Sequence, residues 1–351
     1  MPEDIKIEHV TIGTTQKPFI IAEMSGNHNK SLDRALAIID AAADAGAHAI
    51  KLQTYTAETI TIDMKGGLFD INDPTSLWKG RNLFDLYKSA YTPWEWHAEL
   101  FERARKRGLI IFSTPFDDTA VDFLEELNVS AYKIASFENN HFPLLRKIAS
   151  TGKPVIMSTG LSTLAGLEAA VSTLRNAGCK DLVLLKCTST YPASPVNSHI
   201  STIPHMAQLF DCHVGLSDHT LGVGVPVAAV ALGARVVEKH FTLSRAEGGV
   251  DSAFSLEPHE LKLLVEESER AFDAMGKVTY GILPDEEKSL RFKRSVYVIN
   301  DIKEGDVFTD KNIGIIRPGD GLETPYYELL LGKTAKVAIA RGTPLNFNHI
   351  L

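Results

Sequence analysis

The chain has 351 residues, 44% of them hydrophobic and 23% charged, which is ordinary for a globular protein with a large domain and a small one. The net charge of −8 contains no long run of one sign, so we expect no nucleic-acid partner. No apolar stretch approaches the roughly 20 residues that span a bilayer, and no secretory leader is present, so we expect a cytoplasmic protein with no membrane partner.

Short apolar runs alternate with amphipathic helical stretches between about residue 19 and residue 275. The runs are apolar on both faces, as is typical of parallel strands that helices cover. Most of the intervening stretches repeat apolar residues at three-and-four spacing and end at Gly or Asn. Eight such pairs predict a TIM (β/α)8 barrel. The expected strands are 19–25, 49–55, 109–116, 131–136, 155–160, 182–189, 213–219 and 235–242.

Two regions depart from this alternation. Residues 56–92 follow the second strand and are rich in glycine and aromatic residues, which predicts an insertion over the barrel mouth. Beyond the eighth helix, the chain becomes polar and charged and then forms short alternating strands separated by EGD, PGDG and RGT turns. We therefore expect a barrel domain at 1–283, a linker at 284–293 and a small, mainly β domain at 294–351.

Polar residues gather at the carboxyl ends of the expected strands, where TIM barrels place their active sites. His219 and His240 end the seventh and eighth strands, which are neighbours in a closed barrel. Their imidazoles could hold one divalent ion and leave positions open for water and substrate. Glu23 ends the adjacent first strand and could transfer a proton. The alternatives are that each histidine is satisfied by a neighbouring group and that Glu23 pairs with Lys51 or Lys239.

Lys51, Lys133 and Lys186 come from the second, fourth and sixth strands, and alternate strands fill the same layer of a barrel interior. Three ammonium groups there would repel one another unless an anion joined them, so a phosphate or carboxylate ligand is predicted. Nearby hydroxyl groups would orient that anion as uncharged donors. The alternative is that one or two of the lysines pair with Glu23, Glu138 or Glu238.

The chain also carries an ordered set of motifs: IAEMSGNHN, IKLQTY, FSTPFD, YKIASFE, STG, KCTSTYP, GLSDHTLG and EKHFT, followed by RPGDG and LLGK. This set resembles the sialic acid synthase family over nearly the whole chain. The resemblance implies a TIM barrel with a C-terminal antifreeze-like (SAF) domain, and condensation of phosphoenolpyruvate with an N-acetylated aldose. AEMSGNHN, the 78–97 region and TLSRAEGGVDSAFSLEP are more similar to the pseudaminic acid branch than to the N-acetylneuraminate branch.

The resemblance also implies roles for individual residues. His219 and His240 would bind a divalent metal, with Mn²⁺ expected and Mg²⁺ or Co²⁺ as alternatives. The chemistry of water addition, separately from the resemblance, requires a proton acceptor, and Glu23 or Glu138 could serve. The residues expected to bind phosphoenolpyruvate are Lys51, Thr114, Lys133, Ser136, Ser158 and Ser217. The residues expected to face the sugar are Gln53, Ser189, Tyr191, Asp251 and Arg317.

The expected enzyme is therefore a metal-dependent transferase that joins phosphoenolpyruvate, water and 2,4-diacetamido-2,4,6-trideoxy-β-L-altropyranose to give pseudaminic acid and phosphate. The resemblance implies a domain-swapped homodimer in which Arg317 reaches the barrel of the other subunit. One alternative is the same reaction on another acetamido sugar, giving legionaminic or N-acetylneuraminic acid. Others are a metal aldolase that uses pyruvate and a scaffold whose C-terminal domain binds saccharide or protein. The combination of Glu23, the lysines and the two histidines argues against a scaffold.

Overall fold

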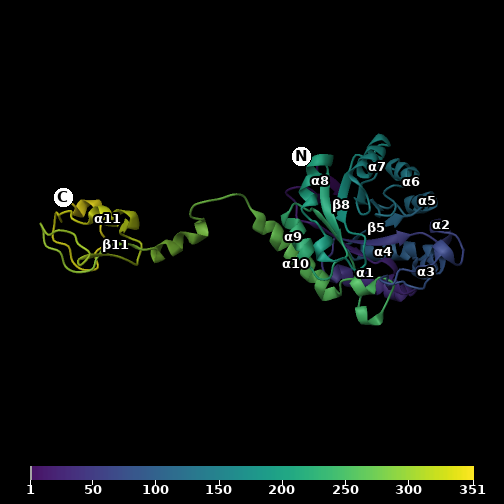
Figure 1. Cartoon of the computed structure of the whole chain (residues 1–351), viewed down its shortest axis with the longest axis horizontal. Helices are drawn as coiled ribbons and strands as arrows, with labels where there is room; N and C mark the ends of the chain where they lie inside the picture. The colour runs from purple at the N-terminus through teal and green to yellow at the C-terminus, as the bar shows by residue number, and fades with distance from the viewer. Residues whose placement is uncertain (1) are drawn as a thin grey trace. The chain divides into compact units, whose positions relative to one another are not determined.

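The computed structural model describes residues 2–351 and contains two compact units, one ending at Gly276 and one spanning Lys277–Leu351. The first unit is a barrel ringed by helices, and the second is a small β-rich unit (Figure 1). Within residues 2–351, no helix combines the length and apolar character needed to cross a bilayer.

Eight parallel strands close the first unit in the order β10-β3-β4-β5-β6-β7-β8-β9, which confirms the predicted TIM barrel. Nearly every strand position is buried, because side chains fill the interior and helices cover the outer face. The strands are β3 (Phe19–Glu23), β4 (Ala49–Thr54), β5 (Ile110–Pro115), β6 (Tyr132–Ile134), β7 (Val155–Ser158), β8 (Leu182–Cys187), β9 (His213–Asp218) and β10 (Val236–His240).

The helices between the strands begin where the sequence supplies capping groups. Ser31, Asp117 and Thr163 each accept a hydrogen bond from a backbone N–H of the first turn that follows. The covering helices are α1 (Leu32–Asp44), α4 (His97–Lys106), α5 (Asp118–Glu126), α6 (Phe142–Ala149), α7 (Leu164–Asn176), α8 (Thr202–Phe210), α9 (Gly224–Ala231) and α10 (Pro258–Met275).

A short antiparallel hairpin, β1 (Ile5–Ile7) and β2 (Val10–Ile12), precedes the barrel and was not predicted. Its isoleucines join the main hydrophobic core. The Nε2 atom of His213 lies 2.9 Å from the Glu3 carbonyl oxygen, so the hairpin region contacts the start of β9. The sequence did not reveal it because three-residue strands are too short to show a periodic pattern.

The predicted insertion after β4 contains α2 (Ala57–Ile60), η2 (Gly67–Phe69) and α3 (Leu83–Ala90), and η3 (Trp94–Trp96) follows it. The segment folds back on itself through a bridge between Asp70 and Asn82. The Asn82 amide donates hydrogen bonds to the Met64 carbonyl at 2.7 Å and to Asp70 Oδ1 at 2.9 Å. These contacts fix the base of the insertion and leave residues 71–81 as its outer loop.

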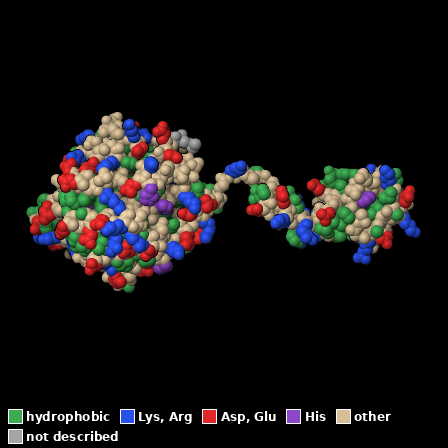
Figure 2. All heavy atoms as spheres, turned by 180° about the vertical axis from the view of Figure 1, so that it is seen from behind, with side chains coloured by type: hydrophobic (Ala, Val, Ile, Leu, Met, Phe, Trp, Pro, Cys, Tyr) green, Lys and Arg blue, Asp and Glu red, His purple; other side chains and the backbone are tan. Residues whose placement is uncertain are grey.

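The second unit contains a three-stranded antiparallel sheet in the order β12-β11-β13, as expected for the small β domain. Its core includes Val296, Val298 and Phe308. The strands and the short helix are β11 (Ser295–Val298), β12 (Ile313–Ile316), β13 (Leu322–Glu323) and α11 (Tyr327–Leu330). The segment predicted as a linker forms η7 (Pro284–Phe292), which has no buried residue. Acidic and basic side chains are interspersed on the visible surface of each unit (Figure 2).

Candidate active site

Two lysines and two glutamates form a buried charge cluster at the carboxyl end of the barrel. The Nζ atom of Lys51 on β4 lies 2.9 Å from Oε2 of Glu23 on β3 and 3.4 Å from Oε2 of Glu238 on β10. Lys133 on β6 reaches across the interior, and its Nζ lies 3.7 Å from Glu238 Oε1. The sequence interpretation considered Glu238 only as an alternative lysine partner, whereas the structure places it between both ammonium groups.

Hydroxyl groups extend this cluster along the rim. Lys51 donates to Thr114 Oγ1 at 3.2 Å, and Lys133 donates to Ser158 Oγ at 2.7 Å. Lys133 also donates to the Ile134 carbonyl at 3.0 Å. Lys51 and Lys133 thus each lie beside a neutral hydroxyl group from the next strand, an arrangement suited to an anion with several oxygens.

Three other predicted serines lie on the same side of the barrel. Ser217 donates to Glu238 Oε1 at 3.0 Å. Ser136 accepts a hydrogen bond from the Gly160 backbone N–H at 3.1 Å. A side chain at Gly160 would collide with both Ser136 and Ser189, whose hydroxyls lie 2.7 and 2.3 Å from the position a Cβ would take. The absence of a side chain at Gly160 therefore lets the two hydroxyls approach the backbone closely.

Burial and neighbouring charges set the protonation of the carboxylates. Burial raises the pKa of Glu23 to about 7, with Lys51 opposing the rise and Glu238 adding to it. Burial also disfavours ionised Glu238, but Lys133 and Lys51 outweigh it and hold the pKa of Glu238 below its usual range. Burial raises the pKa of Glu138 to about 7, with Lys133 opposing. The cluster thus combines an ionised Glu238 with Glu23, and both Glu23 and Glu138 can exchange a proton near neutral pH.

Lys186 does not join the cluster, so the interpretation that three lysines share one layer was wrong. Its Nζ donates to the Cys187 carbonyl at 3.0 Å and to Thr188 Oγ1 at 3.4 Å. Successive residues of a strand point to opposite faces, and Cys187 is paired in register with Ser217, whose hydroxyl donates to Glu238 in the interior. Lys186 therefore points away from the interior, and Lys51 and Lys133 are the two lysines of the cluster.

His219 and His240 meet beside this cluster, with ring centroids 5.3 Å apart. Nδ1 of His219 lies 3.0 Å from the Thr188 carbonyl oxygen, a contact that orients the ring and makes Nε2 its potential ligand nitrogen. Nδ1 of His240 is buried without a hydrogen-bond partner, and the carboxylate of Asp251 lies 3.8 Å from it. Burial, with His219 contributing, holds the pKa of His240 well below its usual range, which keeps the imidazole neutral. Two imidazoles and a nearby carboxylate suit a divalent metal ion.

A buried ion pair lies behind the two histidines. Lys239 Nζ is 2.9 Å from Asp218 Oδ2, and both side chains are almost fully buried. Asp218 also accepts hydrogen bonds from the backbone N–H and hydroxyl of Thr220. Since Lys239 is paired here, the predicted alternative that it is the partner of Glu23 is not realised. The pair joins the residues that directly precede His219 and His240 and so supports their positions.

Four of the five residues predicted to face the sugar lie in the barrel unit, around the histidines and the charge cluster. The ring of Tyr191 is 4.4 Å from that of His219. Asp251 hydrogen-bonds Ser25, and Gln53 donates to Glu23 Oε1 at 2.9 Å. Ser189 Oγ lies 3.7 Å from Cys187 Sγ. Arg317 directly follows β12 in the second unit, and its place in the site stays a prediction.

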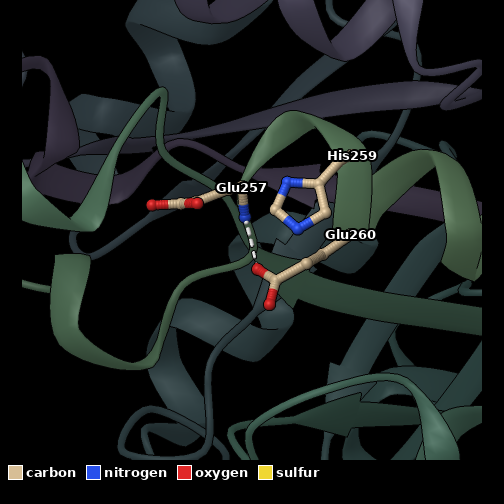
Figure 3. Close-up of side chains that lie close together, drawn as sticks. All are labelled: Glu257, His259 and Glu260. Carbon is tan, nitrogen blue, oxygen red and sulfur yellow. Dashed lines mark hydrogen bonds between the residues drawn. The ribbon is translucent and has the colours of Figure 1, made fainter.

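A second group of potential metal ligands lies at the start of α10. Glu257, His259 and Glu260 each offer a ligand atom, all within 4.8 Å of one another (Figure 3). Both carboxylates already have hydrogen-bond partners. Glu260 accepts a hydrogen bond from the Glu257 backbone N–H at 2.8 Å, drawn dashed in Figure 3. Arg245 pairs with Glu260, and its backbone N–H donates to Glu257 at 2.8 Å. These hydrogen bonds and ion pairs explain why Glu257, His259 and Glu260 lie together: they form a helix cap and an ion-pair network.

The fold and the cluster together define a (β/α)8-barrel enzyme site, in which several strand ends supply the reacting groups. The model of the NeuB family matches residues 38–280 and that of the SAF domain matches residues 293–351. The chain belongs to the NeuB family, which confirms the family predicted from the motifs.

Individual relatives agree with the predicted branch. The chain is 44% identical over 335 residues to a pseudaminic acid synthase of Campylobacter jejuni, covering 95% of this chain and 96% of the relative. It is 37% identical over 328 residues to an N,N'-diacetyllegionaminic acid synthase of the same organism, covering 91% and 96%. An N-acetylneuraminic acid synthetase structure from Leptospira borgpetersenii superposes with a TM-score of 0.72 at 33% identity, covering 82% of this chain and 95% of that chain.

Proposed function

We propose that this chain is a pseudaminic acid synthase that condenses phosphoenolpyruvate with the 2,4-diacetamido-2,4,6-trideoxy sugar and water. The observation that carries the proposal is that a two-lysine hydroxyl cluster and a histidine pair lie at the same end of the barrel, with His240 paired in register with Glu23 of the cluster. The greater identity to a pseudaminic acid synthase than to a legionaminic acid synthase of the same organism supports the choice of sugar.

In this proposal, phosphoenolpyruvate lies over the lysine cluster. Lys51 and Lys133 neutralise its phosphate and carboxylate, and the hydroxyls beside them fix its orientation. The residues assigned to this role are Lys51, Thr114, Lys133, Ser136, Ser158 and Ser217. Glu238 keeps the two ammonium groups together by pairing with both, at 3.4 and 3.7 Å.

His219 and His240 would hold a divalent metal, and Asp251 could add a carboxylate oxygen. The unpartnered, buried Nδ1 of His240 fits this role, since a buried polar atom normally has a partner. When bound, such an ion supplies Lewis acidity toward the aldehyde oxygen of the open-chain sugar. Imidazole and carboxylate ligands accept Mn²⁺, Mg²⁺ and Co²⁺, and Mn²⁺ is our first choice.

The reaction joins carbon 3 of phosphoenolpyruvate to the aldehyde carbon of the sugar. A water molecule then adds to carbon 2 and gives up a proton, and the tetrahedral product releases inorganic phosphate. We assign the proton acceptor to Glu138, because its buried Oε2 has no hydrogen-bond partner. Glu23 Oε2 likewise has no hydrogen-bond partner, but it lies 2.9 Å from the Lys51 ammonium group, and Glu23 Oε1 accepts a hydrogen bond from Gln53, so we assign Glu23 to holding Lys51 in place.

The pH dependence tests this assignment. The pKa of Glu138 is raised to about 7, and the protonated carboxyl cannot accept a proton, so activity should fall as the pH drops below about 7. Glu138→Gln should lower kcat by about 10²- to 10⁴-fold and remove this acidic limb from the pH profile of kcat/KM. Glu23→Gln serves as the matched variant and should keep the limb. A limb that persists in Glu138→Gln and disappears in Glu23→Gln would assign the proton transfer to Glu23.

We also propose that the enzyme works as a domain-swapped homodimer in which Arg317 completes the site of the other subunit. Arg317→Ala and His240→Ala chains should each be inactive alone. Co-expressed in equal amounts, they should recover about a quarter of wild-type activity, because half of the dimers are mixed and each mixed dimer has one intact site. No recovery in a preparation shown to contain mixed dimers would place Arg317 in its own subunit's site, and full activity of the Arg317→Ala chain alone would place Arg317 outside the reaction.

Phosphate release tests the function itself. The purified full-length protein should release phosphate when Mn²⁺, phosphoenolpyruvate and the trideoxy sugar are all present. Substituting N-acetylmannosamine or the legionaminic acid precursor tests the two other acetamido-sugar alternatives directly. Pyruvate-dependent condensation without phosphate release would favour the aldolase, and inactivity with every sugar would favour the scaffold.

A further inference from the structure

Trp78 ties the outer loop of the insertion to the loop that carries Asp251. Its indole N–H donates to the Val250 carbonyl at 3.0 Å. Asp251, the next residue, hydrogen-bonds Ser25 and lies 3.8 Å from His240. Trp78 lies 172 residues before Val250 in the sequence, yet it contacts this loop at the residue directly before Asp251.

The same indole continues a group of rings that begins at the histidine pair. Tyr191 lies 4.4 Å from His219, and Trp78 lies 5.8 Å from Tyr191. Phe254 fills the space beside them, at 5.2 Å from Tyr191 and 4.9 Å from His240. Counting from His219, where the aldehyde is proposed to lie, Tyr191 is the first ring and Trp78 the second. The far end of an extended sugar chain would therefore lie near Trp78.

A cavity of about 510 Å³ opens beside Trp78. Leu77, Trp78, Val250 and Ala253 form the apolar part of its lining, and Asn29, Lys30, Arg81 and Ser89 contribute polar groups to the rest. The indole is only partly buried, so one part is free to contact a ligand while the N–H is held by Val250. An apolar wall of this kind favours a methyl group over a hydroxymethyl group, because a hydroxyl placed against it loses hydrogen bonds to water without replacement.

We propose that Trp78 is a specificity-determining residue that forms the outer wall of the sugar site. It selects an acetamido sugar whose terminal carbon is a methyl group over the same sugar with a terminal hydroxymethyl group. This inference rests on the proposed function and deepens it, because it assigns the preference for a deoxygenated sugar to one side chain of the insertion.

The test compares kcat/KM for the 2,4-diacetamido-2,4,6-trideoxy sugar and for its 6-hydroxy counterpart. The wild-type ratio should be about 10². Trp78→Ala should lower this ratio to below about 10, chiefly by raising KM for the trideoxy sugar, while KM for phosphoenolpyruvate stays within about twofold. Trp78→Phe keeps an apolar ring and loses the N–H donor, so it should retain more of the preference than Trp78→Ala.

Leu68→Ala is the matched control, because Leu68 belongs to the same insertion and is 96% exposed. It should leave the ratio and both KM values unchanged. An unchanged ratio in Trp78→Ala, with an active wild-type enzyme that prefers the trideoxy sugar, would overturn the role of Trp78 and leave the proposed function intact. A wild-type enzyme that releases phosphate with neither sugar would overturn both.

Discussion

Lys133→Met should lower kcat/KM for phosphoenolpyruvate by about 10²- to 10³-fold, equivalent to about 3–4 kcal/mol. Lys133 is only 1% exposed, and its ammonium group lies in the barrel interior beside Ser158. Burial holds the pKa of Lys133 below its usual range, with Glu238 opposing this effect. A bound phosphate would favour the ammonium form of Lys133. Because little water reaches this site, the substitution removes a strong interaction between the ammonium group and the phosphate.

Methionine keeps an unbranched side chain one atom shorter than that of lysine, and Glu238 retains Lys51 at 3.4 Å, so the variant should fold. Thermal unfolding checks this point, and steady-state kinetics with each substrate varied in turn separates the two KM values. Lys186→Met is the matched control, because Lys186 is a lysine of the same rim that contacts no carboxylate of the cluster. An equal loss in both variants would contradict the assignment of phosphate binding to Lys133.

Much of the barrel could be predicted because its signals are local. Each buried strand is a short apolar run, and each helix is marked by its spacing and its cap, so the eight units could be counted from the sequence. The closed barrel then predicts which strand ends are neighbours, and this rule alone predicts that His219 lies beside His240, as the structure has it. The order of the motifs gave the family.

What the sequence could not predict depends on side-chain direction and long-range contact. Lys186 and Cys187 are adjacent in the sequence, and only the register of β8 decides which of them faces the interior. By contrast, the inward direction of Glu238 could have been predicted from the alternation of side chains along a strand. Glu238 is two residues before His240 on β10 and therefore shares its face. The contact of Trp78 with Val250 joins segments 172 residues apart through an irregular loop, which carries no periodic signal.

His240→Ala should remove the bound divalent metal and lower phosphate release by about a thousandfold, equivalent to about 4 kcal/mol. The reason is that this imidazole is neutral, largely buried and without a hydrogen-bond partner at Nδ1, so metal coordination would account for its burial. Its loss would leave His219 as the one imidazole of the pair. Metal content after dialysis, measured by elemental analysis, gives a readout that does not depend on turnover. The ion pair between Lys239 and Asp218 remains, so the barrel should stay folded.

His259→Ala is the control that distinguishes the two groups of potential ligands. His259 is exposed at the start of α10, and Glu257 and Glu260 beside it are already engaged by Arg245 and by the helix cap. The variant should therefore keep both its metal and its activity. If His259→Ala lost the metal while His240→Ala retained it, the catalytic ion would belong to the α10 group, and the Lewis-acid role assigned to the histidine pair would be wrong. Loss in His240→Ala alone places the ion between β9 and β10, where the aldehyde of the sugar must meet carbon 3 of phosphoenolpyruvate.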